Sequence, residues 1–196
     1  LHLSFFLIIF LLLFFLFSEG PKSFLFNLSW VISIFTVVII HELTHSIVGR
    51  LFGYKVKEII LLPIGGMARM TEIPEKPFSE IIVAIVGPIS NIIIGLFSSF
   101  AVILIYGPEY LLTTELETYP FIKLFIAFNF LMALFNLLPI FPMDGGRILR
   151  GVFAMFTSYD KATHWAAEIG RFLSVLMIIF AMLTRQVWLL LIGIFI

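Results

Sequence analysis

Long apolar runs that are almost free of charge divide this chain, and they restrict it to a membrane. Residues 31–40, for example, include no Asp, Glu, Lys or Arg. Overall, 61% of the residues are hydrophobic and 12% are charged, whereas soluble domains have about 45–50% apolar and about 25% charged residues. A spanning helix needs about 20 apolar residues. We therefore predict an integral, multi-pass membrane protein.

The hydropathy pattern also predicts the number of helices. Six segments are apolar enough to span a membrane: residues 3–17, 24–51, 79–106, 121–138, 163–183 and 187–196. Connection 53–77 differs, because polar and apolar residues alternate at its start and Gly65-Gly66 lies in its middle, a pattern typical of paired strands. The predicted fold is an all-α polytopic membrane protein with about six transmembrane helices. A small membrane-associated β-hairpin or sheet is expected between helices two and three.

Basic residues predict how the helices are oriented. Most Lys and Arg residues lie in the connections after helices two and four, whereas the connection after helix three has three Glu and neither Lys nor Arg. Basic connections favour the cytoplasmic side of a cell membrane, so both termini and the opening of any site at these helix ends are predicted to be cytoplasmic. The formal net charge is zero, which gives no indication of a nucleic-acid partner.

Two imidazoles and a carboxylate lie inside the second apolar run, in the sequence HELTH. His41 and His45 are four positions apart and share one helical face, with Glu42 one step round from it. This HExxH arrangement places two zinc ligands and a general base in one turn. Ionisable groups are costly in a membrane helix and are functional candidates for that reason. The alternative is a His–Glu pair that only bridges helices.

A catalytic zinc site needs a third protein ligand and an open position for water. Because the chain has no cysteine, that ligand would be a histidine or a carboxylate. Of the two aspartates, Asp160 lies among polar loop residues, whereas Asp144 follows the fourth apolar segment at a depth similar to that of HELTH. Prolines and Gly145-Gly146 break the helix there. We predict that Asp144 is the third ligand of one zinc ion; its alternative role is to cap a helix that starts near Arg147.

HELTH, followed about a hundred residues later by MDGG, resembles the site-2 protease family of intramembrane zinc metalloproteases. The stretches LLPIGGMARM, GPISN and FNLLPIFPMDGGRILR are similar to microbial members of that family. The resemblance implies that His41, His45 and Asp144 bind zinc and that Glu42 is the catalytic base. Some microbial members carry regulatory CBS domains after the membrane region. We therefore expect residues 1–196 to be a single transmembrane protease core, with any such domain outside it.

The resemblance extends to three further residues. Asn136, in FNLLP, matches an asparagine near the scissile carbonyl, where an amide could stabilise an oxyanion; hydrogen bonding between helices is an equal alternative. Gly65 and Gly66 match a segment that meets the substrate as an added strand, with a plain tight turn as an equal alternative. Asn91, in GPISN, and Asn129 are expected only to pack helices.

The predicted function is hydrolysis of peptide bonds within transmembrane segments of membrane-anchored substrates, that is, regulated intramembrane proteolysis. Its partners are then a transmembrane protein or peptide and the lipid bilayer. The alternatives are a membrane zinc transporter, a non-catalytic metal-binding membrane protein and an inactive scaffold. A transport path needs polar groups across the full membrane, whereas the ionisable cluster here is predicted to lie at one depth. The complete set of ligands and base argues against an inactive scaffold.

Overall fold

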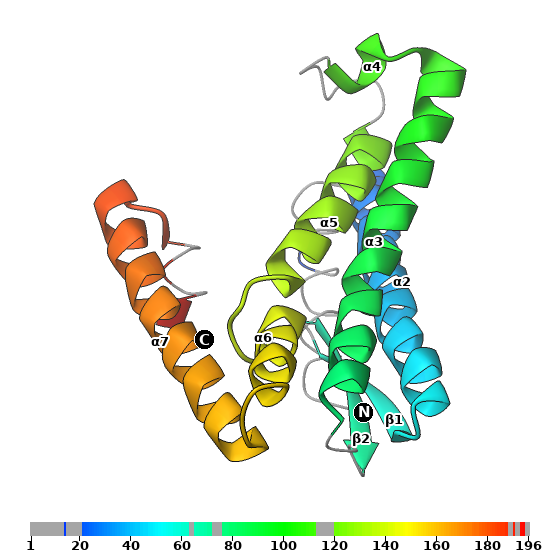
Figure 1. The fold of residues 1–196 in the computed structure, drawn as a ribbon. Helices are drawn as coiled ribbons and strands as arrows, with labels where there is room; N and C mark the ends of the chain where they lie inside the picture. Colours follow the sequence, from blue (N-terminus) through cyan, green and yellow to red (C-terminus); the bar gives the residue numbers. More distant parts are fainter. Residues whose placement is uncertain are drawn as a thin grey trace.

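The computed structural model is built mainly of helices (Figure 1). It describes residues 14, 21–62, 65–71, 76–112, 120–187, 190 and 193–194. In chain order, its elements are α2 (Pro21–Leu51), β1 (Lys55–Leu62), β2 (Gly65–Thr71), α3 (Pro77–Tyr106), α4 (Glu109–Leu112), α5 (Pro120–Asn136), α6 (Asp144–Ala154) and α7 (Tyr159–Thr184).

Three of the described helices are long and apolar enough to cross a membrane. They are α2 over Leu25–Leu51, α3 over Pro77–Tyr106 and α7 over Tyr159–Thr184. With the shorter apolar helix α5, they correspond to the second to fifth segments predicted from the sequence. The first and last predicted segments lie almost wholly outside the described residues, so the count of six spans stays a prediction.

The outer and inner faces of these helices differ in the way that lipid requires. Large apolar side chains are exposed along α3 and α7, among them Phe97, Leu104 and Phe172. Buried positions of the same helices hold small residues such as Gly87 and Ala166. In a bilayer, exposed apolar faces match the solvent, and small residues let helix backbones approach closely.

Helix α3 is the common partner of the helices that surround it. It packs against α2, α5 and α6, and α6 in turn packs against α7 (Figure 1). Between α2 and α5, the ring of Trp30 meets those of Phe121 and Phe128 edge to face, with centroids 6.0 Å apart in both pairs. The helix that carries HELTH and the helix that follows MDGG are thus both packed against α3.

Strands β1 and β2 form a two-stranded antiparallel sheet in connection 53–77. Leu61 pairs with Gly66 and Leu62 with Gly65, so both glycines belong to strand β2, and a role confined to a tight turn does not describe them. The residues that join the strands, 63–64, lie outside the described part of the chain. The sheet contacts α2, and its place at the membrane surface stays a prediction.

Helix α6 begins at Asp144, whereas the sequence led us to expect a start near Arg147. Its N-cap residue is Met143, and no side chain caps it, so capping is not the role of Asp144. The chain turns tightly before this helix, and the backbone of Gly145 lies close to the carbonyl oxygen of Leu138. A Cβ on Gly145 would collide with that oxygen. This close approach brings the end of α5 against the start of α6 and fixes where Asp144 lies.

Substituting Gly145 by Ala is expected to lower the free energy of unfolding by about 1–3 kcal/mol, because the added methyl group forces the backbone to shift. The measurement is the midpoint of thermal unfolding in detergent. Gly170→Ala is the control, because a Cβ there would have its nearest neighbour at 3.4 Å, an ordinary contact. Equal midpoints for the two variants would contradict the close packing at Gly145.

Candidate metal centre

Helix α2 directs the residues of HELTH that we predicted as functional into the protein. His41, Glu42 and His45 are 2%, 9% and 3% exposed, whereas Leu43 and Ile47, on the other side of the helix, are exposed. The four-residue spacing places the two imidazoles side by side, with ring centroids 4.6 Å apart and an edge-to-face arrangement. A helix otherwise suited to lipid therefore buries two potential metal ligands and an acid.

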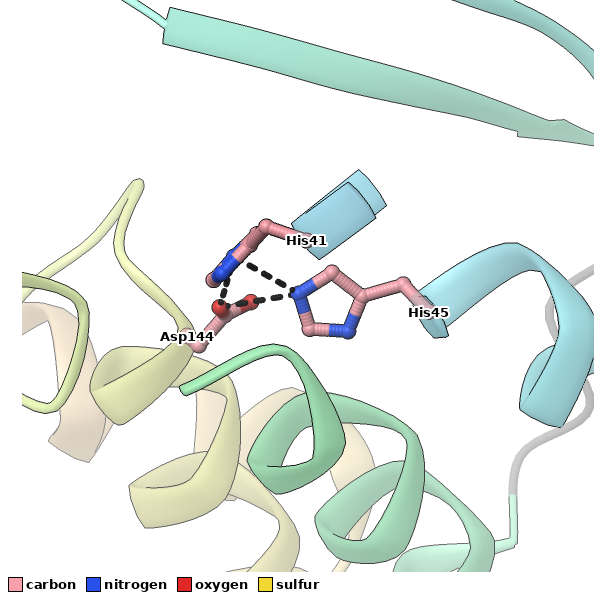
Figure 2. Close-up of side chains that lie close together, drawn as sticks. All are labelled: His41, His45 and Asp144. Carbon is pink, nitrogen blue, oxygen red and sulfur yellow. Dashed lines mark hydrogen bonds and ion pairs between the residues drawn. The ribbon is translucent and has the colours of Figure 1, made fainter. Parts of the chain in front are cut away.

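Helix α6 completes the group by placing Asp144 against both imidazoles (Figure 2). Asp144 Oδ2 lies 3.2 Å from His41 Nε2 and 3.0 Å from His45 Nε2, and the two Nε2 atoms are 3.0 Å apart. Figure 2 shows the three side chains pointing toward one another from two different helices. The structure thus brings together the three residues that the sequence predicted as ligands, although 103 positions separate His41 from Asp144.

Each imidazole is held by a hydrogen bond at its other nitrogen. His41 Nδ1 lies 2.5 Å from Asn91 Oδ1, and His45 Nδ1 lies 2.6 Å from the carbonyl oxygen of Val83. Because both partners are acceptors, each Nδ1 carries the proton and donates it. Each Nε2 is then left with a lone pair that faces the carboxylate and the other ring.

The three residues fit a zinc ion. Three electron-rich atoms at 3.0–3.2 Å from one another repel unless a cation lies among them. A tetrahedral zinc ion with bonds of 2.0–2.1 Å needs ligand atoms roughly 3.3 Å apart, which is close to the distances here. Two imidazole nitrogens and one carboxylate oxygen are a donor set that suits zinc, and three protein ligands leave one position open for water.

Gly87 provides the space that the two imidazoles occupy. A Cβ at this position would collide with the ring of His45 and would lie 2.7 Å from His41 Cε1. The structure shows that what packs against the α3 backbone is the pair of imidazoles themselves.

Asn91 does more than pack helices, which is all that the sequence led us to expect. It is fully buried and bonds His41, while its amide nitrogen donates to Asn129 Oδ1 at 3.3 Å. Asn129 in turn donates to the carbonyl of Phe125 at 2.9 Å. This series of bonds fixes which end of the Asn91 amide faces the imidazole. The only sequence signal was an asparagine four positions after Gly87, and it did not indicate a contact with His41.

The structure also describes the remaining predicted residues. Glu42 follows His41 on the same turn of α2 and is buried. Asn136 is half-buried at the end of α5, where its amide nitrogen donates to the carbonyl of Met132 at 3.0 Å, a bond within its own helix. Gly65 and Gly66 begin β2. The structure therefore brings the three predicted ligands together directly, whereas the roles of the other residues depend on where a substrate binds.

Comparison with known proteins identifies the family. The model of peptidase family M50 matches residues 29–118 and 111–177. The chain belongs to peptidase family M50. A zinc metalloprotease of Methanocaldococcus jannaschii is 38% identical over 165 residues, which are 84% of this chain and 46% of that protein. Stage IV sporulation protein FB of Bacillus subtilis is 32% identical over 127 residues, which are 64% of this chain and 41% of that protein.

A solved structure supports the same relationship. The site-2 protease from Methanocaldococcus jannaschii is similar to this M50 chain with a TM-score of 0.71 and 32% sequence identity, and the match covers 99% of this chain and 84% of that one. The resemblance to site-2 proteases is therefore confirmed. The M50 chain spans less than half the length of the two curated relatives named above.

Substituting Asn91 by Leu is expected to weaken zinc binding about 10–100-fold, because residues that orient a ligating histidine typically contribute this much to metal affinity. The measurement is competition for zinc with a chelator in detergent. Asn136→Leu is the matched control, since Asn136 bonds a carbonyl of its own helix, and it should retain wild-type affinity. Equal zinc affinity in both variants would show that Asn91 does not position His41.

Proposed function

We propose that this M50 chain hydrolyses peptide bonds inside the membrane, with zinc bound by His41, His45 and Asp144. The proposal rests mainly on three atoms that lie 3.0–3.2 Å from one another: the Nε2 atoms of both histidines and one carboxylate oxygen of Asp144. The histidines belong to α2, which is long and apolar enough to span a membrane, and Asp144 belongs to α6. The names of its relatives, zinc metalloprotease and site-2 protease, support this activity. When bound, zinc supplies a Lewis acid that activates a water molecule and polarises the carbonyl of a peptide bond.

Glu42 is the proposed general base. It lies beside His41 on α2 and is 9% exposed, so it is close to the three ligands and largely shielded from solvent. Its carboxylate accepts a proton from the attacking water and delivers that proton to the leaving amide nitrogen. A C–O bond forms as the peptide C–N bond breaks, and no covalent bond joins the substrate to the chain.

Asn136 is the proposed donor to the carbonyl oxygen on which negative charge develops. Its amide group has two N–H bonds, and Met132 accepts one of them. The other is left to donate to a substrate oxygen. Such a donor stabilises the transition state more than the ground state, because the oxygen acquires charge only as the bond to water forms.

A membrane-anchored substrate is proposed to bind in an extended form. A transmembrane helix satisfies its own amides internally, so a peptide bond within it becomes accessible only after local unwinding. In the described part of the chain, the sheet has two strands, so each strand has an outer edge that the other does not cover. The sheet contacts α2. We propose that the unwound stretch pairs with this sheet near Gly65 and Gly66, so that new backbone hydrogen bonds replace those lost.

The site is proposed to open toward the cytoplasm, with both termini on that side. The end of α2, the strands and the connection from α6 to α7 lie at one end of the molecule (Figure 1), and basic residues such as Arg50, Lys55 and Lys161 lie in or next to these parts. His41 precedes Arg50 by nine residues, which places it about 14 Å below that end at 1.5 Å per residue. Water must therefore reach the metal along a polar path from this side.

Zinc transport has less support than proteolysis. A transport path requires polar ligands at successive depths across the membrane. Among the residues that the structure describes, His41, His45 and Asp144 form one group able to hold a metal, at a single depth on α2 and α6. Nothing in the described part of the chain supplies a second site along a path.

Substituting Glu42 by Gln is expected to abolish cleavage of a single-span reporter peptide in detergent while zinc content stays at the wild-type level, because the base is lost and the three ligands remain. Cleavage products and zinc content are measured on the same samples. His45→Ala is the companion variant and should lose both zinc and cleavage. Retained turnover by Glu42→Gln would show that another group is the base.

Substituting Asn136 by Ala is expected to lower kcat about 10²–10³-fold, as the loss of one oxyanion donor does elsewhere, with little change in KM or in zinc content. Steady-state kinetics with the same reporter provide both constants. A kcat close to that of the wild type would leave Asn136 with its bond inside α5 as its only role.

A further inference from the structure

A second buried polar cluster lies near the metal centre, where the start of α3 meets α6. Its centre is Glu80, which is 0% exposed. Arg150 of α6 donates to Glu80 Oε1 from Nε at 2.9 Å and from Nη2 as well. The hydroxyl groups of Tyr54 and Tyr159 are also buried here and close enough to interact with the charge of Glu80. The proposed hydrolysis uses none of these groups.

Arg150 is the cation that compensates the charge of Glu80. The hydroxyl oxygen of Tyr54 has no hydrogen-bond partner among the described residues. Burial, and after it the charge of Glu80, raise the pKa of Tyr54, so this phenol stays neutral beside the carboxylate. Removing Arg150 would leave a buried carboxylate without a counter-charge, which is strongly destabilising.

The ion pair fixes α6 against α3 at a point close to the metal centre. Arg150 lies six residues after Asp144 on α6, or about 9 Å along the helix. At the next position, a Cβ on Gly151 would lie 2.7 Å from Ile81 Cγ1 and 3.1 Å from the carbonyl oxygen of Pro77. A close backbone approach and a two-armed ion pair together set the position and the rotation of α6.

The same face of α3 also holds the two histidines. Glu80, Val83, Gly87 and Asn91 are spaced three, four and four residues apart, so they lie along one side of the helix, and all four are buried. Val83 and Asn91 accept hydrogen bonds from the imidazoles, and Gly87 provides their space. Glu80 extends this face to α6, the helix that carries the third ligand.

We propose that Glu80 and Arg150 are positioning residues that hold Asp144 at metal-binding distance from His41 and His45. The proposal rests on the metal site described above and adds a second requirement for it. Zinc affinity depends on an ion pair that touches no ligand, because the pair determines where the start of α6 lies relative to α2.

The test compares zinc affinity and thermal stability in Arg150→Met, Arg150→Lys and the double variant Glu80→Gln/Arg150→Met. Zinc affinity is measured by chelator competition in detergent, below the unfolding midpoint of every variant, and the visible spectrum of the cobalt-loaded protein reports ligand geometry. Arg150→Met is expected to bind zinc at least about tenfold more weakly and to change the cobalt spectrum. Arg150→Lys should recover much of the affinity, because it keeps the charge.

The double variant separates positioning from stability. It removes the unpaired buried charge, so its thermal midpoint should exceed that of Arg150→Met, while its zinc affinity should stay low because no ion pair holds α6. The control is Glu168→Gln/Arg171→Met, which removes an exposed ion pair of 2.8 Å on α7 and should leave affinity at the wild-type level.

Two results would overturn the proposal. Wild-type zinc affinity and cobalt spectrum in Arg150→Met, with only a lower midpoint, would show that the pair stabilises the fold and does not position Asp144. Recovery of zinc affinity together with stability in the double variant would lead to the same conclusion. A wild-type chain that binds no zinc would instead overturn the proposed function itself.

Discussion

The candidate metal centre depends on one constraint: the Nε2 atoms of His41 and His45 and a carboxylate oxygen of Asp144 are all electron-rich and repel one another at 3.0–3.2 Å. The Nδ1 protons of both histidines are committed to acceptors on α3, so neither Nε2 can relieve the repulsion by donating to Asp144 while the rings are neutral. A metal ion held by all three atoms removes this repulsion. The fold therefore has to supply rigid support from outside, because in the absence of a metal the ligands themselves favour separation.

Helix α3 supplies that support with one face. Four of its buried residues contribute. Val83 and Asn91 accept hydrogen bonds from the imidazoles, Gly87 leaves room for both rings, and Glu80 binds Arg150 of α6. None of them is a metal ligand. A membrane helix offers few polar groups with which to orient ligands, and here they are concentrated on the face that lipid does not reach.

The sequence predicted those parts of the centre that local patterns encode. HELTH specifies two imidazoles on one face because its spacing matches a helical turn, and the apolar runs predicted the bounds of α2, α3, α5 and α7 to within a few residues. The third ligand, Asp144, was accessible through the scarcity of aspartates and through the family resemblance. The spacing in HELTH, the apolar runs and the number of aspartates can each be read from one segment or from the composition.

The rest could not be read in this way because it depends on contacts between segments. Asn91 contacts His41, 50 positions away, and Glu80 contacts Arg150, 70 positions away. Nothing near Asn91 in the sequence distinguishes an amide that orients a histidine from one that packs helices. The start of α6 at Asp144 was missed for a related reason. Gly145 normally argues against a helix, but here the carbonyl of Leu138 leaves no room for a side chain.

The position of α7 has a mechanical consequence. In the described part of the chain, α7 packs mainly against α6, on the side away from α2 and α3 (Figure 1). A pull on α7 would therefore reach α6, and with it Asp144, while the two histidines stay anchored to α3. Two of the three predicted ligands are anchored to α3 directly and the third through α6, so a force applied at one edge of the molecule would reach the site through one carboxylate, against the ion pair that holds α6 to α3.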